Sequence, residues 1–168
     1  MFVTTDPHGD SMTDFIRSTA KAIIVKDGKV LLNRSVGERI GEYYSLPGGG
    51  QHRFEPLEDA VRRECLEETG LHVRVLRLAA VCEEIWDSEE MRKAHPKYCH
   101  RMLQIFLCEV DENFPPENAK ELDYQMVESV WVPLDEVDTL PLEPRPLTNQ
   151  FSAVLNGTAP LFLGTVYC

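Results

Sequence analysis

Apolar positions near the start of the chain follow a pattern that is typical of a β-hairpin. Residues 19–25 (TAKAIIV) form one strand-like run, and residues 30–34 (VLLNR) form a second. Asp27 and Gly28 stand between the two runs, and residues of these types readily adopt the positive φ angles that a tight hairpin turn requires. The pattern predicts two antiparallel strands joined at Asp27-Gly28.

A sharp turn and a helix are predicted next along the chain. Residues 43–46 precede Pro47 and three consecutive glycines, a combination that indicates an abrupt change of backbone direction. A helical pattern then runs from Pro56 to about Thr69. Gly70 follows it, in the position that glycine commonly takes as a left-handed C-cap.

The rest of the chain alternates between strand-like runs and polar connections. The strand-like runs are residues 73–81, 101–110, 127–134 and 161–168, and a second helix is predicted at residues 147–155. The charged stretch before residue 101 is long for a plain hairpin, and long loops often carry substrate contacts. Strands around one or two helices, with no internal repeat, predict an α/β sandwich with a mixed β-sheet.

The predicted helix carries carboxylates on the face that is expected to be buried. At about 100° per residue, Leu57, Ala60 and Val61 form one apolar stripe. Further along the helix the same stripe is occupied by acidic residues: Glu64, Glu67 and Glu68. Like charges at this spacing repel, and anions near a helix C-terminus oppose the macrodipole. A hard divalent cation, Mg²⁺ or Mn²⁺, would remove this conflict, whereas a fully solvated acidic face is the alternative interpretation.

A single arginine on the flank of this helix can organise the surrounding carboxylates. Arg63 can reach Asp59 or Glu67 at four-residue spacing, and it can also meet Glu55 in the preceding loop. The sequence therefore predicts a structural role for Arg63 beside the metal site.

Composition and charge narrow the classes of function. The 168 residues carry a formal net charge of −11, so attraction to nucleic acid or to an anionic membrane is not expected, and an anionic substrate needs local cations. The five cysteines include no CxxC pair, which argues against a disulfide framework. The first residues do not resemble a secretory signal, and we expect a cytoplasmic protein.

The chain is expected to form a single domain with an N-terminal extension. Residues 1–17 are expected to form a tail or arm, and residues 18–168 the domain.

These residues together match a known family signature. Gly49, Glu55 and the run 63–71 (Arg-Glu-Cys-Leu-Glu-Glu-Thr-Gly-Leu) resemble the Nudix hydrolase signature along its whole length, residues 49–71. The one unusual position is Cys65, where the family generally has a larger aliphatic residue. The resemblance covers roughly residues 18–140 and implies the Nudix α/β/α sandwich with a mixed sheet.

The resemblance also implies a reaction and a set of site residues. Nudix enzymes split a diphosphate linked to another group, using a metal-activated water. Carried over to this chain, Glu64, Glu67 and Glu68 would bind Mg²⁺, with Mn²⁺ as a substitute, and the Gly48 carbonyl would add an oxygen ligand. Glu55 and Arg63 would orient the loop and the helix. The base varies within the family, and the candidates here are carboxylates outside the signature: Glu109, Asp111, Glu121, Asp123 and Glu128.

Two residues are candidates for binding the rest of the substrate. Arg34, at the end of the hairpin, resembles a basic position that many Nudix enzymes place near substrate phosphates. Trp86 lies where the long loop begins, and its aromatic face could stack on a nucleobase. The substrate is expected to be a small molecule of the nucleotide type, and analogy with the family makes a homodimer plausible.

Two functions compete for this sequence. The first is Mg²⁺-dependent hydrolysis of the pyrophosphate linkage in a nucleoside diphosphate derivative or a nucleoside triphosphate. The alternative is a catalytically silent Nudix-like module that senses a nucleotide. The complete set of helix carboxylates favours the enzyme, because silent modules often lose one of them.

Overall fold

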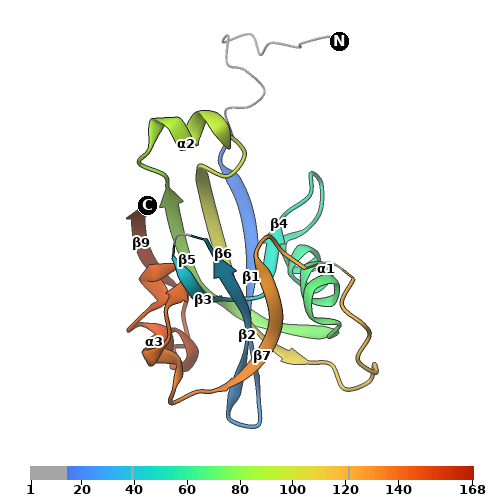
Figure 1. Cartoon of the computed structure of the whole chain (residues 1–168). Coiled ribbons are helices and arrows are strands. Elements are labelled where there is room, and N and C mark those ends of the chain that lie inside the picture. The colour runs from blue at the N-terminus through green and yellow to red at the C-terminus, as the bar shows by residue number, and fades with distance from the viewer. Residues whose placement is uncertain (1–14, 39, 121) are drawn as a thin grey trace.

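The β-hairpin predicted at the start of the chain is present in the computed structural model, which describes residues 15–38, 40–120 and 122–168 (Figure 1). Strand β1 (Arg17–Lys26) pairs antiparallel with β2 (Lys29–Gly37), and Lys26 lies opposite Lys29. Asp27 has φ 50° and Gly28 has φ 72°, so both turn residues adopt the left-handed conformation. The prediction of a tight turn at Asp27-Gly28 is confirmed.

The strands of the described residues form one mixed sheet in the order β8-β3-β2-β1-β6-β5-β9, with β4 paired to β1 and β7 paired to β2. The remaining strands are β3 (Gly41–Ser45), β4 (Gly48–Gly50), β5 (Val73–Ile85), β6 (His100–Val110), β7 (Met126–Pro133), β8 (Leu142–Glu143) and β9 (Leu161–Tyr167). β1 pairs with β6, β3 with β8 and β5 with β9 in parallel, and the other pairs are antiparallel. The first half of β1 pairs with β4 and its end pairs with β2, so the glycine turn lies beside the central strand.

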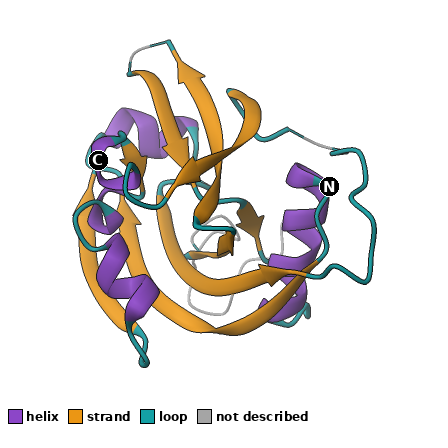
Figure 2. Ribbon diagram, turned by 90° about the horizontal axis from the view of Figure 1, so that it is seen from below, coloured by secondary structure: helices purple, strands orange, loops and turns teal. Residues whose placement is uncertain are grey.

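Helices lie on both faces of the curved sheet (Figure 2). The long helix α1 (Leu57–Thr69) packs on one face, and its Ala60, Val61 and Cys65 are buried against Ala22 and Ile24 of β1. On the other face, Phe151 and Val154 of α3 (Phe151–Asn156) belong to a second core. Apolar residues that alternate along β1 therefore contribute to both cores, and the layers are those of the predicted α/β/α sandwich.

Several predicted elements differ in detail from the structure. β5 continues to Ile85 rather than ending at residue 81, because its last residues pair with the start of β6 and with β9. The long loop contains a short helix α2 (Glu89–Ala94), and its N-cap is Ser88, whose side chain accepts a hydrogen bond from Met91 N. The helix predicted at residues 147–155 is a 3₁₀ turn (Arg145–Leu147) followed by α3.

The predicted tail or arm covers residues 1–17, and residues 1–14 of it lie outside the described residues. Its last residue, Arg17, is the first residue of β1. Within the described parts of the chain, no helix has the length and the apolar character that crossing a bilayer requires.

Candidate active site

Helix α1 presents one face first to the apolar core and then to the glycine turn. Ala60, Val61 and Cys65 are fully buried under the sheet. Because residues three and four positions apart share a helix face, Glu64 and Glu68 follow on the same side and come to lie against β4. Gly70 ends the helix with φ 71°, and its N–H donates to the Leu66 carbonyl at 3.0 Å. The predicted helix and its glycine cap are confirmed.

The glycine turn can approach β1 and α1 closely because it has no side chains. A Cβ on Gly48 would lie 2.2 Å from the Ala20 carbonyl oxygen, and a Cβ on Gly49 would lie 2.4 Å from Oε2 of Glu64. Both distances are far below van der Waals contact, so neither position accepts another residue without movement. The two glycines therefore allow a backbone segment to lie directly over the carboxylates of the helix.

Arg63 connects the loop, the turn and the helix. Its Nε and Nη2 donate to the two oxygens of Glu55 at 2.7 and 3.0 Å, and Nη2 also donates to the Gly50 carbonyl at 3.0 Å. Its Nη1 donates to Glu64 at 2.7 Å and to Glu67 at 3.1 Å. The hydrogen bonds from Arg63 lower the pKa of Glu55 to about 2, and Glu55 in turn raises the pKa of Arg63. Asp59, which sequence spacing also allowed as a partner, pairs with Arg62 instead.

Glu68 is the most deeply buried of the predicted ligands. Only 5% of it is exposed, and Oε2 accepts hydrogen bonds from Gly48 N at 2.9 Å and from Asn33 Nδ2 at 2.7 Å. Ser129 Oγ donates to the side-chain oxygen Oδ1 of Asn33 at 2.9 Å, which orients the Asn33 amide. Burial raises the pKa of Glu68, and the positive charge of Lys21 opposes this change.

Sequence reasoning missed both Asn33 and Lys21. Asn33 is 2% exposed, and its signal was a polar amide directly after the apolar run of the hairpin's second strand. Lys21 interrupts the apolar run of β1, lies opposite Gly48 in the sheet register, and donates from Nζ to the Gly48 carbonyl. A polar residue inside an apolar strand was the signal that could have found each of them.

The donors at this site suit a hard divalent cation. Carboxylate oxygens and a backbone carbonyl are the ligands that Mg²⁺ and Mn²⁺ prefer. In the structure, cationic side chains of the protein contact these oxygens. Arg63 pairs with Glu64 and Glu67, and Lys21 donates to the Gly48 carbonyl. Across the described residues, no three His, Cys, Asp or Glu side chains form a preassembled metal site. Ligation by all three glutamates would therefore require a rearrangement of their side chains.

The structure places the predicted substrate residues outside this cluster. Arg34 is engaged by two carboxylates, Glu128 at 2.8 Å and Glu42 at 3.0 Å. Trp86 follows β5 and meets the ring of His95 edge to face, with 6.0 Å between ring centroids. Either residue would have to exchange or extend these contacts in order to hold a substrate.

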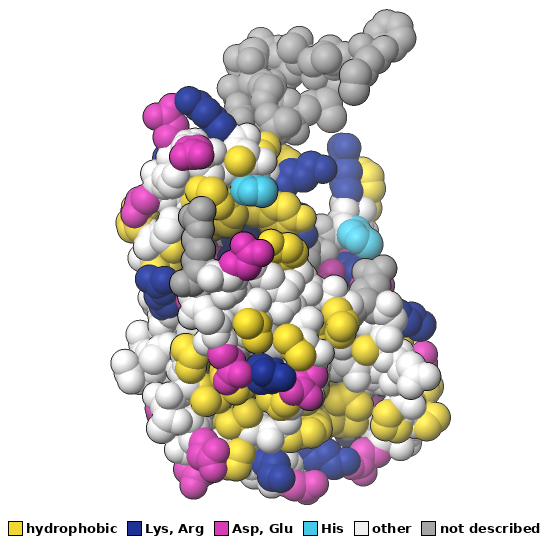
Figure 3. Space-filling view, in the orientation of Figure 1, with side chains coloured by type: hydrophobic (Ala, Val, Ile, Leu, Met, Phe, Trp, Pro, Cys, Tyr) yellow, Lys and Arg dark blue, Asp and Glu magenta, His cyan; other side chains and the backbone are white. Residues whose placement is uncertain are grey.

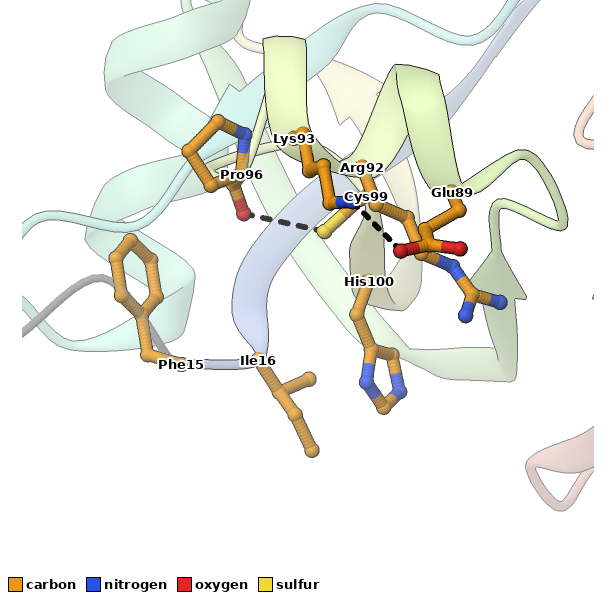
Figure 4. Close-up of a pocket in the computed structure, with 8 residues that line it drawn as sticks. All are labelled: Phe15, Ile16, Glu89, Arg92, Lys93, Pro96, Cys99 and His100. Atoms are coloured by element: carbon orange, nitrogen blue, oxygen red, sulfur yellow. Dashed lines mark hydrogen bonds and ion pairs between the residues drawn. The ribbon is translucent and has the colours of Figure 1, made fainter. Parts of the chain in front are cut away.

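Two cavities of the structure are lined by residues other than the helix carboxylates. One of about 500 Å³ lies between the start of β1 and α2, where the side chains of Phe15, Ile16 and His100 line it (Figure 4). The other, of about 530 Å³, lies beside α1 and includes Arg63 and Phe114. The face shown in Figure 3 carries acidic and basic side chains interspersed rather than a continuous basic surface.

The candidate bases differ in their relation to the site. Glu109 pairs with Arg74 at 3.1 Å, Glu128 pairs with Arg34, and Asp111 accepts hydrogen bonds from Asn113. Glu121 lies outside the described residues. Asp123 is the described candidate whose charge contributes to raising the pKa of Glu68.

Comparisons with known proteins identify the family of this α/β/α sandwich, in which a glycine turn lies over a carboxylate-bearing helix. A family model described as the NUDIX domain matches residues 16–151. An RNA pyrophosphohydrolase of Psychrobacter arcticus is 32% identical over 122 residues, which cover 66% of this chain and 68% of that protein. The chain therefore belongs to the Nudix family.

Solved structures agree with this assignment. The MutT protein from Bacillus halodurans is 25% identical, with a TM-score of 0.63 and coverage of 90% of each chain. A NUDIX hydrolase from Nitrosomonas europaea has a TM-score of 0.64 at 22% identity, covering 84% of this chain and 88% of that chain. At the lower identity the likeness shows the shared fold.

Proposed function

We propose that this chain hydrolyses the pyrophosphate linkage of a nucleoside diphosphate derivative or a nucleoside triphosphate, with Mg²⁺ as the cofactor and Mn²⁺ as a substitute. Glu64, Glu67, Glu68 and the Gly48 carbonyl would hold the cation. The observation that carries the proposal is the contact between Glu68 and the glycine turn, where Oε2 accepts from Gly48 N at 2.9 Å. This contact brings the acidic end of α1 to the backbone carbonyl that would complete the ligand set.

The other residues of the site would position this machinery. Glu55 holds the guanidinium of Arg63, and Arg63 binds the Gly50 carbonyl, so hydrogen bonds link the loop, the turn and the helix. A bound divalent cation supplies Lewis-acid activation of a water nucleophile and neutralises charge on the phosphoryl oxygens. Arg34 and Trp86 remain our candidates for contacts with the phosphates and the nucleobase.

Asp123 is the base that we favour. Its carboxylate accepts a hydrogen bond from Tyr124 N at 2.8 Å, and it is exposed to solvent. An exposed carboxylate with an electrostatic effect on Glu68 can take a proton from water near the helix and release it to solvent.

Product analysis would test the function directly. Purified protein with Mg²⁺ would be incubated with dNTPs, ADP-ribose, NADH, nucleotide sugars and diadenosine polyphosphates, beside the variants Glu68→Gln and Glu58→Gln. Glu58 is on the same helix but pairs with Arg62 on its exposed side, which makes Glu58→Gln a matched control. We expect one substrate class to be cleaved by the wild type and by Glu58→Gln, and not by Glu68→Gln.

The opposite pattern would reject the proposal. Turnover by Glu68→Gln within a few-fold of wild type would show that the site is misassigned. Tight nucleotide binding without cleavage, under varied divalent cations and alkaline pH, would favour the sensing module.

A second candidate substrate comes from the name of one relative. The Psychrobacter arcticus protein is an RNA pyrophosphohydrolase, which favours an RNA substrate here. The net charge of −11 weighs against strong binding of a long polyanion. A short RNA with a 5′-triphosphate belongs in the same assay, and its cleavage in preference to nucleotides would replace the small-molecule proposal.

A further inference from the structure

Lys21 is a basic side chain of the central strand β1 that reaches the carbonyl oxygen of Gly48 in the glycine turn. β1 places it opposite Gly48 in the sheet register, and Nζ donates to the Gly48 carbonyl. The side chain is half-buried, and among the described residues it forms no ion pair with a carboxylate. Its ammonium group is therefore hydrogen-bonded to one backbone oxygen, and its charge also acts on Glu68 at the acidic end of α1.

Arg63 and Arg34, the two cations that the sequence analysis assigned to the site, are already neutralised. Arg63 is bound by Glu55, Glu64 and Glu67, and Arg34 is bound by Glu42 and Glu128. A diphosphate with two or three negative charges is repelled by a protein of net charge −11. To bind, it needs a cationic side chain that can leave its present partner and bind the phosphate. Lys21 is better suited to bind the phosphate than Arg63 or Arg34. It would break one hydrogen bond to a neutral carbonyl, whereas either arginine would have to break an ion pair.

The oxygen that Lys21 occupies is also the one proposed as a metal ligand. An ammonium group and a divalent cation on the same carbonyl repel each other strongly at contact distance. The flexible four-carbon stem of lysine allows Nζ to move without any change in the backbone. Arrival of the metal would therefore favour a different partner for Lys21, and a phosphate oxygen of the substrate is the anion that accompanies the metal.

We propose that Lys21 is a movable counterion that occupies the Gly48 carbonyl before the divalent cation binds and then binds the substrate's diphosphate. This inference rests on the proposed function. It assigns Lys21 two opposite effects, because its charge disfavours the metal in the absence of substrate and favours the substrate once the metal is present.

The variant Lys21→Met tests these opposite effects, since methionine is similar in length and carries no charge. Mg²⁺ affinity without substrate would be measured by titration calorimetry, and kcat and KM by steady-state hydrolysis. We expect Mg²⁺ to bind more tightly to Lys21→Met, and KM for the substrate to rise by about tenfold, the effect of losing one charged contact. Lys21→Arg, which keeps the charge, should recover most of the KM.

Lys29→Met is the matched control, because Lys29 is an exposed lysine at the far end of the same hairpin. It should leave both Mg²⁺ affinity and KM unchanged. Thermal unfolding of each variant would show that it is folded before the constants are compared.

The outcomes separate this inference from the function on which it rests. Weaker Mg²⁺ binding in Lys21→Met, or values equal to those of Lys29→Met, would overturn the role of Lys21 while the wild type still hydrolyses its substrate. A wild-type protein that neither binds Mg²⁺ nor cleaves any substrate would overturn the proposed function, and the role of Lys21 with it.

Discussion

Asn33 on β2 and Glu68 on α1 are joined by a 2.7 Å hydrogen bond from Nδ2 to Oε2, and both residues are almost fully buried. The amide is itself held by Ser129 on β7. A buried carboxylate needs hydrogen-bond donors in place of water, because an unpartnered charge is costly in the interior. Strands on the sheet and a helix beneath it thus combine to hold one carboxylate.

Replacing the side-chain amide of Asn33 should show how much the buried carboxylate of Glu68 depends on it. In Asn33→Leu, Glu68 loses a donor and Ser129 loses its acceptor, and we expect the free energy of unfolding to fall by about 1–3 kcal/mol. Urea denaturation at pH 7 would measure it. Ser129→Ala removes one neutral hydrogen bond and should cost about 1 kcal/mol or less. Equal losses in the two variants would show that Asn33 does not support the charge of Glu68.

Glu68→Gln should stabilise the metal-free protein at pH 7. Burial raises the pKa of Glu68 above its ordinary value of 4.5, so the ionised form destabilises the fold at pH values above the folded pKa. Glutamine removes the charge and can still accept from Gly48 and Asn33. The gain should disappear as pH falls below 4.5, where the wild-type carboxyl is protonated in both states.

The same variant should lose its response to Mg²⁺. A cation that binds only the folded wild type raises the melting temperature by mass action. We expect this rise in the wild type and in Glu58→Gln, and little or none in Glu68→Gln, as measured by differential scanning fluorimetry in EDTA and in Mg²⁺. A lower melting temperature for Glu68→Gln in EDTA would contradict the view that this charge is a structural cost.

Glu55→Gln should destabilise the protein in a pH-dependent manner. Arg63 lowers the pKa of Glu55 from 4.5 to about 2, so the pair contributes stability that is fully present above pH 4.5 and is lost as pH falls toward 2. We expect a loss of about 1 kcal/mol at pH 7, less than the pKa change alone implies, because solvent screens the pair. Denaturation of wild type and variant at several pH values should show the two curves converging at acid pH. A constant difference between them would contradict the prediction.

Gly70→Ala should be far more damaging than Gly28→Ala. Both glycines have φ near 71°, where alanine costs roughly 1–2 kcal/mol. At Gly70 the new Cβ would also lie 1.9 Å from the Glu117 carbonyl oxygen, whereas at Gly28 nothing lies within 4 Å. Gly28→Ala therefore measures the backbone cost alone, and the extra loss in Gly70→Ala measures the contact between α1 and the 117–120 segment. Similar losses in both variants would show that this segment moves away freely.

Local patterns were sufficient to predict the hairpin, the helix and the glycine turn. Each depends on residues close in the chain: the turn on Asp27-Gly28, the end of the helix on Gly70, and the carboxylate stripe on spacing along α1. The same proximity made Arg63 predictable as a partner of Glu55 and Glu67, although spacing alone could not choose between Glu67 and Asp59.

Contacts between distant segments were decided only in three dimensions. Lys21 meets Gly48, and Asn33 meets Glu68, because β1 and β2 pack beside β4 and over α1. Arg34, which looked available along the chain, is bound by Glu128 from β7. The carboxylate stripe and the glycine turn could be predicted from the sequence because they depend on residues close in the chain, and the family was indicated by the resemblance to the Nudix signature. Only the three-dimensional structure shows which charged side chains are paired within the protein and which are available to bind a ligand. The physical reason is that electrostatic energy depends on distance in space rather than on separation along the chain.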